Sequence, residues 1–283
     1  MDHVHRIGAT AGPAVPAPAY FMVGAVAQYA GAAIAVVLFE RMSAPGVALV
    51  RVASAGAILT VAYRFPWRGW DRRRWLVVAG FGAALALMNL LYYLAIDRLP
   101  LGTATAIEFT GPVAVAAASA RSARSVASVA LAAGGVLVLA DVQWEASAAG
   151  VVFALGAAAM WAGYILLGHR VAHDGLGVRG LAVSMLVGSL VIAPFGAGSA
   201  VAAFASPELL AVCVLVGLLS NVVPYVLDQI VLRQLSEGAF ALLLALLPAT
   251  AAVVGAVALR QHPTVTEIVG IVCVTVAVAV RPR

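Results

Sequence analysis

The feature that most constrains this chain is a series of ten apolar segments that follow one another with only short connections. A bilayer-spanning helix needs about 20 mostly apolar residues, and each segment approaches that length. We predict spanning helices at residues 20–39, 44–63, 75–96, 101–119, 123–141, 147–168, 180–197, 208–232, 238–258 and 265–280. The connections leave no room for a soluble domain, so the chain is not expected to be an enzyme.

The composition is that of a chain surrounded by lipid. Hydrophobic residues make up 64% of the 283 residues and charged residues 10%, with a mean hydropathy of +1.04, whereas a soluble domain is about half apolar and a quarter charged. The formal charge of +5 would suit nucleic acid, but basic residues also gather in cytoplasmic loops, so no nucleic-acid partner is expected. Both cysteines lie in apolar segments and no metal-ligand spacing occurs, which predicts no disulfide, no metal and no cofactor.

The arginines give the chain an orientation, because the cytoplasmic loops of membrane proteins are enriched in basic residues. If the N-terminus is cytoplasmic, thirteen of the 17 basic residues fall in cytoplasmic segments, three fall in outer loops and Arg51 falls within a span. We therefore predict a multi-pass protein of the bacterial inner membrane with both termini in the cytoplasm. Residues 1–19 are polar and rich in proline and alanine, and are expected to form a mobile lead.

The two halves of the chain resemble each other at an offset of 136 residues. Leu99–Gly102 then aligns with Leu235–Gly238, and Pro112 aligns with Pro248. In each half a helix ends, a short turn holds a glycine, and the next helix carries a proline about ten residues later. Because five spans is an odd number, a duplicated half inserts upside down, and such inverted repeats place a substrate site near the midplane between them.

The predicted fold is therefore all-α and integral to the membrane, with ten transmembrane helices arranged as two inverted five-helix repeats. We place the first repeat at residues 20–142 and the second at residues 143–283. Rocking of one repeat against the other about a fixed site would give a transported molecule alternating access to the two faces. A duplicated bundle that serves only as a scaffold is the alternative.

Two charged residues interrupt the apolar segments. Arg51 and Glu108 each lie about seven residues into a predicted span that enters from the outer face, which places both roughly 10 Å deep at 1.5 Å per residue. Ionisable groups inside a membrane are costly and are candidates for function by default. The two could pair, or could hold the carboxylate and ammonium groups of a zwitterionic substrate, with Glu108 as the protonatable group. The alternatives are a structural ion pair, or an Arg51 side chain that extends toward the interface.

Three prolines within the predicted spans indicate bent helices. A proline removes the hydrogen bond to the carbonyl four residues before it, so Pro112 leaves the carbonyl of Glu108 free, and Pro224 does the same for Ser220. Pro248 is expected to bend the ninth span. Such irregular backbone is tolerated inside a membrane where it faces protein or a water-filled cavity.

Further polar and aromatic residues inside the spans are candidates for lining a substrate cavity. Some share a helix face, since Trp161 and Tyr164 are three residues apart and Asn221 and Tyr225 are four apart. Aromatic residues near the ends of spans also serve as interfacial anchors, which is the alternative role. The candidate cavity residues are Gln28, Tyr29, Asn89, Tyr93, Trp161, Tyr164, Asn221 and Tyr225.

These segments resemble the EamA-like branch of the drug/metabolite transporter superfamily, and within it the RhtA-type threonine/homoserine exporter family. The resemblance covers nearly the whole chain, and it implies ten helices in inverted repeats that export small metabolites, notably amino acids, in exchange for protons. By this resemblance Arg51 and Glu108 match charged positions of the family's motifs, and Trp161 and Tyr164 match aromatic positions of its sixth helix. Its most specific stretches are Ser43–Val52, Leu99–Val113, Trp161–Val171 and Val223–Val226.

The ninth helix departs from the pattern of that family. The family usually carries a glutamate just before the proline of this helix, where the chain has Leu247. The family's helix usually ends in Gly-Glu, where the chain has Arg260 and Gln261. Glu108 is then expected to be the only carboxylate well inside a span.

Three functions are compatible with these features. The first is inner-membrane export of small amino acids such as threonine or homoserine, or of related metabolites, by alternating access coupled to proton antiport. The second keeps the fold but carries drug-like or amine metabolites, which the aromatic residues would suit. The third is a membrane scaffold or sensor that transports nothing. For a transporter, the expected partners are a zwitterionic small molecule, protons and membrane lipid.

Overall fold

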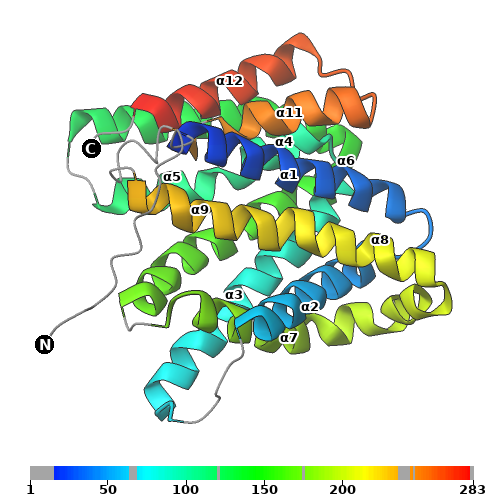
Figure 1. Ribbon diagram of the computed structural model, residues 1–283. Helices are drawn as coiled ribbons and strands as arrows, with labels where there is room; N and C mark the ends of the chain where they lie inside the picture. Colours follow the sequence, from blue (N-terminus) through cyan, green and yellow to red (C-terminus); the bar gives the residue numbers. More distant parts are fainter. Residues whose placement is uncertain are drawn as a thin grey trace, which may run out of the picture.

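Every regular element in the described part of the chain is helical, as predicted. The computed structural model describes residues 16–63, 69–119, 122–173, 176–234, 243–244 and 246–280. The elements are α1 (Ala17–Leu38), α2 (Ala44–Tyr63), α3 (Arg72–Ile96), α4 (Leu101–Glu108), α5 (Thr110–Ser119), α6 (Ala123–His173), α7 (Gly177–Ala205), α8 (Pro207–Gly217), the π-helix η1 (Leu218–Val222), α9 (Val223–Gln234), α11 (Leu247–Ala258) and α12 (Val265–Val280) (Figure 1).

Several of the described helices are suited to a membrane. Six segments are long and apolar enough to cross one: Ala17–Leu38, Ala44–Tyr63, Arg72–Ile96, Ser147–Gly168, Val178–Ala205 and Pro207–Leu227. Three shorter apolar helices cover Val126–Leu139, Leu247–Ala258 and Val265–Ala277. These helices agree with a chain that crosses the membrane several times, while the count of ten and the inverted arrangement stay predictions.

Two of the predicted spans are interrupted rather than continuous. The segment expected at residues 101–119 forms α4 and α5, which separate at Phe109, three residues before the helix-disrupting ring of Pro112. The segment expected at residues 208–232 widens into η1 directly before Pro224. A π-helical turn holds an extra residue, so the proline is accommodated there without a sharp break.

The ends of other helices differ from the predictions by a few residues. The backbone at Ser147 leaves the helical region (φ −161°, ψ 80°), so α6 is two helices joined directly at a kink. The sequence predicts one span that ends at residue 141 and another that begins at residue 147. α7 continues past its predicted end at residue 197 because the apolar, small-residue sequence runs on to Ala205. α1 begins at Ala17, inside the predicted lead, and residues 1–15 lie outside the described part. Pro248 lies in the first turn of α11, where no N–H is needed. Residues 243–244 just before it are also helical, and the bend expected at Pro248 stays a prediction.

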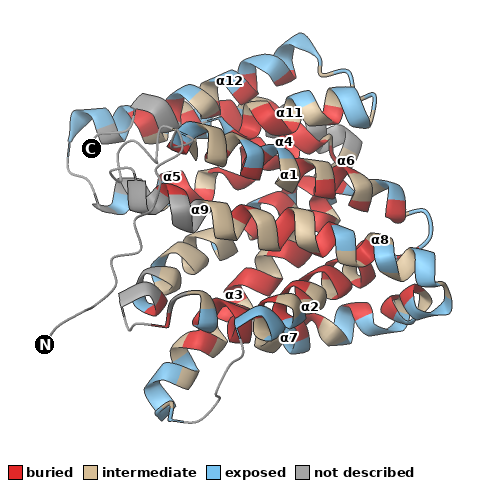
Figure 2. Ribbon diagram, in the orientation of Figure 1, coloured by how far each residue is buried: buried red, intermediate tan, exposed pale blue. Residues whose placement is uncertain are grey.

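Helices distant in sequence pack side by side and bury the centre of the bundle. α1 lies against α9, α2 against α7, α3 against α6, and α4 against α11, and the buried residues gather between them (Figure 2). Glycines allow the closest approaches, since a Cβ on Gly31 would overlap the side chain of Ser220, and one on Gly102 would lie 2.7 Å from that of Ala252. The polar residues of α2, α3, α4 and η1 are enclosed in this interior.

Candidate functional site

A buried arginine joins α2 to the π-helix. Arg51 is 5% exposed, and its Nε donates to Oδ1 of Asn221 at 2.8 Å while its Nη2 donates to the carbonyl oxygen of Ser220 at 3.1 Å. Its guanidinium carbon lies 4.8 Å from the centre of the Tyr93 ring, which is a cation–π contact. Side chains and backbone from three separate elements therefore hold this cation inside the bundle.

The proline after η1 explains why the carbonyl of Ser220 can accept from Arg51. Pro224 has no N–H to donate to the carbonyl four residues before it, so that oxygen is left for another donor. Gly217 brings α8 close enough to α2, because a Cβ at this position would lie 2.8 Å from the backbone oxygen of Arg51. The sequence predicted the free carbonyl at Ser220, and the structure identifies the side chain that uses it.

Glu108 forms the second charged position of this interior. It is the last residue of α4, is 7% exposed, and directly precedes the helix interruption at Phe109. Tyr92 donates to or accepts from Oγ1 of Thr105 at 2.8 Å, one helical turn before the interruption. Both Tyr92 and Tyr29 interact electrostatically with the carboxyl group of Glu108. Two buried tyrosines therefore lie within electrostatic reach of the carboxyl group.

A direct pairing of Arg51 with Glu108, one of the options considered, is not what the structure has. The two groups interact electrostatically, but neither an ion pair within 4.0 Å nor a hydrogen bond joins these two described residues. The hydrogen bonds of Arg51 go to η1 instead, because the fold brings Ser220 and Asn221 against the guanidinium. The two charges therefore remain separate groups in one interior.

The predicted cavity residues divide into a polar and an aromatic group. Tyr29, Tyr93 and Asn221 are buried with the charged residues. Asn89 is buried too, but its Nδ2 donates to the carbonyl of Leu85 in its own helix at 2.8 Å, so this donor is already used. The partly buried Gln28 contributes its backbone carbonyl, which accepts from the Oγ of Ser220 at 3.2 Å.

The aromatic group lies on α3, α6 and α9. The rings of Tyr164 and Phe81 stack with their centres 4.8 Å apart, and Tyr164 is 6.3 Å from Tyr225. Trp161 meets Phe109 edge to face at 4.9 Å. Trp161, Tyr164 and Tyr225 are partly buried, whereas Phe81 and Phe109 are fully buried. Trp161 therefore contacts the residue at which α4 and α5 separate, next to Glu108.

Sequence reasoning missed several residues of this region. Tyr92 was not among the candidate cavity residues, yet it is 8% exposed and its hydroxyl group shares a hydrogen bond with Oγ1 of Thr105. Glu267 is a second buried carboxyl group, 4% exposed, but it lies in the first turn of α12 rather than well inside a span. The sequence carried a signal for it, because Thr264 and Glu267 have the spacing of a capping box, and they exchange the expected hydrogen bonds.

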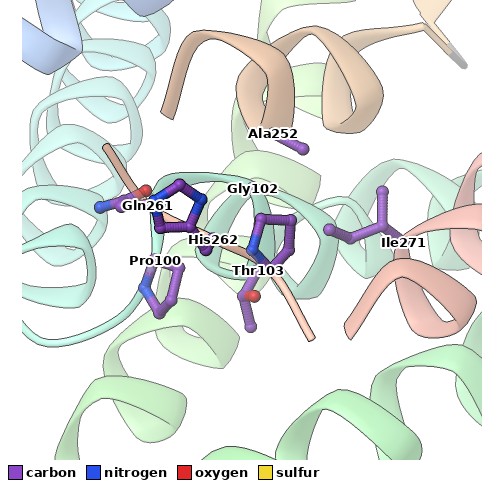
Figure 3. A pocket seen from close by; sticks show the side chains of 8 residues that line it. Pro100, Gly102, Thr103, Ala252, Gln261, His262 and Ile271 are labelled. Atoms are coloured by element: carbon purple, nitrogen blue, oxygen red, sulfur yellow. The ribbon is translucent and has the colours of Figure 1, made fainter. Parts of the chain in front are cut away.

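The connection between α11 and α12 covers the start of α4 (Figure 3). Oε1 of Gln261 accepts from the N–H of Leu101 at 3.0 Å, which satisfies one of the donors that a helix N-terminus leaves free. Oε1 of Glu267 accepts from the hydroxyl of Thr103 at 3.3 Å. A small pocket remains here, lined by Pro100, Gly102, Thr103, Ala252, Gln261, His262, Pro263 and Ile271. Two hydrogen bonds thus join α4 to the α11–α12 connection and to α12 at this end of the α4–α11 contact.

Comparison with known proteins identifies the family. The model of the EamA-like transporter family matches residues 148–280. The threonine/homoserine exporter RhtA of Salmonella typhimurium (strain LT2) is 36% identical over 251 residues, which cover 87% of this chain and 84% of that protein. This chain belongs to the EamA-like transporter family. The RhtA exporter of Escherichia coli (strain K12) is 35% identical to the EamA-like chain over 245 residues, 85% of this chain and 82% of its own.

These matches confirm the resemblance inferred from the sequence. Within the EamA-like family the chain is of the RhtA type, and its relatives are membrane transporters rather than enzymes. A solved crystal structure described only as that of a protein has a TM-score of 0.64 and 16% identity, covering 94% of this chain and 98% of its own. That structure shares the fold of the EamA-like chain.

Proposed function

We propose that this EamA-like protein exports small amino acids of the threonine/homoserine type, or related metabolites, across the bacterial inner membrane. The observation that carries the proposal is the buried interior in which the guanidinium of Arg51 and the carboxyl group of Glu108 interact without pairing. Separate opposite charges inside a membrane bundle suit the two charged groups of a zwitterion. The relatives named as threonine/homoserine exporters support the same class of cargo.

Alternating access between two inverted repeats is part of the proposal. An inverted repeat would make the helices of residues 20–142 counterparts of those of residues 143–283: α1 of the part of α6 after Ser147, α2 of α7, α3 of α9, and α4 of α11. The α1–α9 contact then corresponds to the contact of α3 with the part of α6 after Ser147. The α2–α7 and α4–α11 contacts each join a helix to its own counterpart. All of these contacts occur, which supports a two-fold relation between the halves with the polar interior near its axis. Both termini would then face the cytoplasm.

We further propose that proton entry drives export through Glu108. Its carboxyl group is buried beside a helix interruption and forms no hydrogen bond with the described residues. A charged carboxylate is costly in such a place, so binding a substrate ammonium group and binding a proton become alternatives. Exchange of one for the other would couple the outward movement of substrate to the inward movement of a proton.

Counterflow in proteoliposomes tests these assignments. Labelled L-threonine and L-homoserine should exchange for unlabelled substrate, and an imposed proton gradient should accelerate net transport. Glu108→Gln should exchange substrate more weakly and lose the response to the gradient, while Glu40→Gln, at an exposed carboxylate in the α1–α2 connection, should behave as the unmodified protein. Unchanged pH dependence in Glu108→Gln would contradict proton coupling, and absence of exchange for every amino acid would contradict the export function.

A second cargo is favoured by one observation, the aromatic group. Stacked rings such as Phe81 and Tyr164 offer faces to an apolar or cationic molecule, which suits drug-like or amine metabolites. Thermal stabilisation of the purified protein across a metabolite panel separates the two cargoes. Stabilisation by hydrophobic amines, with none by amino acids, would favour this alternative.

A further inference from the structure

The polar interior contains three buried donors without a hydrogen-bond partner among the described residues. They are Nη1 of Arg51, Nδ2 of Asn221 and the hydroxyl group of Tyr93. All three residues are more than nine-tenths buried, since Arg51 is 5% exposed and the other two are 0% exposed. A buried donor without a partner is unfavourable and uncommon in folded proteins, so three of them in one place point to a ligand.

Two of these side chains, Asn221 and Tyr93, each contact the third, Arg51. Arg51 has already used Nε and Nη2 on η1, which leaves Nη1 free. Asn221 has used its amide oxygen to accept from Arg51, so the free atom of its amide is the nitrogen. The ring of Tyr93 lies against the same guanidinium. Its hydroxyl group lies near the side chains of Arg51 and Ser220 but makes no hydrogen bond to either within 3.5 Å. A single small group could therefore meet all three.

The chemistry of that group follows from the donors. Two NH2 groups and one O–H group, together with a positive charge, are complementary to an anion with several acceptor sites. Glu108 does not fill this role, because it forms no hydrogen bond with Arg51 in the structure. A carboxylate has two oxygens with about four acceptor positions and forms strong charge-assisted bonds with guanidinium.

We propose that Arg51, Asn221 and Tyr93 form the subsite that binds the carboxylate group of the transported molecule. This assignment rests on the proposed export function and narrows its substrate class to molecules that carry a carboxylate. The three free atoms are closed off from solvent in this structure, so the substrate reaches them when the two halves part. Glu108 is then the group left for the ammonium end.

Competition between close analogues tests the requirement for a carboxylate. L-threoninol and L-threonine methyl ester keep the ammonium group and the side chain of L-threonine but lack the anionic carboxylate. Each should compete with labelled L-threonine at least about tenfold more weakly than unlabelled L-threonine does, the loss expected for a hydrogen bond to a charged group. Equal competition by threoninol, with threonine transported normally, would overturn the subsite and leave the export function intact.

Two small substitutions test the residues themselves. Asn221→Asp keeps an oxygen for Nε of Arg51 but replaces the free donor by an acceptor, and should weaken threonine binding by about a hundredfold. Tyr93→Phe keeps the ring on the guanidinium and removes only the hydroxyl group, with an expected loss of about tenfold. Tyr63→Phe is the matched control, because Tyr63 is exposed at the end of α2 and should bind threonine normally.

The variants also distinguish a carboxylate subsite from other uses of the three free donors. If Asn221→Asp does not fold, Tyr93→Phe alone decides, and threonine binding within twofold of Tyr63→Phe would overturn the proposal. Chloride binding is a further test, since an inorganic anion could use the same donors. Stabilisation of the protein by chloride that Tyr93→Phe abolishes, together with full competition by threoninol, would assign the donors to chloride and overturn their role in substrate binding. If no amino acid is exchanged at all, the export function itself has failed.

Discussion

Arg260 has a backbone conformation that favours glycine. Its φ is +55°, at the end of α11, where the N–H of Gln261 turns back to the carbonyl of Gly255 at 3.2 Å. A side chain in this left-handed region costs roughly 1–2 kcal/mol. We expect Arg260→Gly to raise the free energy of unfolding by about 1 kcal/mol, measured as a Tm roughly 2–4 °C higher in detergent.

Arg41→Gly is the matched control for that prediction. Arg41 is also exposed and lies in a connection between helices, but its φ is not positive. Glycine there only adds freedom to the unfolded chain, so the Tm should stay level or fall. A rise of equal size in both variants would contradict backbone strain at Arg260.

Single residues were predicted where their chemistry contrasts with the apolar sequence around them. Arg51 and Glu108 stand out on that basis, and both are buried. Their partners do not stand out, because the bond from Arg51 to Asn221 joins positions 170 residues apart and depends on how α2 meets η1. Tyr92 was missed because neighbouring tyrosines on one helix give no sign of which contacts a partner such as Thr105.

At the scale of elements, η1 depends on the proline that follows it. Pro224→Ala would restore an N–H that can donate to the carbonyl of Ser220, in competition with Nη2 of Arg51. We expect this variant to fold but to transport threonine about tenfold more slowly, the effect of weakening one charge-assisted hydrogen bond. Initial rates of counterflow measure it.

Pro194 provides the control for the Pro224→Ala prediction. Pro194 lies within α7 and is exposed, so Pro194→Ala also restores an N–H inside a helix but has no counterpart to Arg51 nearby in the described contacts. Its transport rate should match that of the unmodified protein. Equal slowing in both variants would mean that Pro224 acts through general helix rigidity rather than through Ser220.

The contact between α3 and α7 depends on a glycine. A Cβ on Gly82 would overlap the backbone carbonyl of Ser184, and backbone cannot move aside as a flexible side chain can. We expect Gly82→Ala to lower the free energy of unfolding by about 1–3 kcal/mol, measured by thermal unfolding. Gly134→Ala, where nothing lies within 4 Å, should cause no loss, and equal losses would contradict this contact.

Most helices were predictable from hydropathy because a span is defined by its length and apolar composition. The interruptions were not, since Phe109 and η1 look like ordinary span residues in a hydropathy pattern. Pro112 and Pro224 signalled that the helices change there but not how. The helix breaks before Pro112 and widens into a π-helical turn before Pro224, according to how each helix packs in the bundle.

At the scale of the whole molecule, alternating access requires that one end of the α4–α11 contact open and close. In this structure that end is held by Gln261 on the N–H of Leu101 and by Glu267 on Thr103. These bonds join the two proposed repeats at the end of α4 away from Glu108. If the halves part here, the same bonds must break in each transport cycle.

A cross-link at this end tests whether it moves. A Cβ on Gly255 would lie 3.3 Å from that of Leu101, close to the 3.5–4.5 Å of a disulfide, and 2.6 Å from Oε1 of Gln261, the end of a flexible side chain that can shift. We therefore expect Leu101→Cys with Gly255→Cys, with Cys213 and Cys273 replaced by alanine, to form a disulfide on oxidation. Counterflow should then fall to the level of protein-free liposomes, because the halves can no longer part.

Reduction of the disulfide should restore counterflow, since the substitutions themselves leave the polar interior unchanged. Each single-cysteine variant should transport equally with and without oxidant, which separates cross-linking from oxidative damage. Full exchange by a protein shown to be cross-linked on a gel would mean that this end stays closed throughout the cycle. Access to Arg51 and Glu108 would then have to come from elsewhere, and rocking of two equivalent halves would be the wrong description of this transporter.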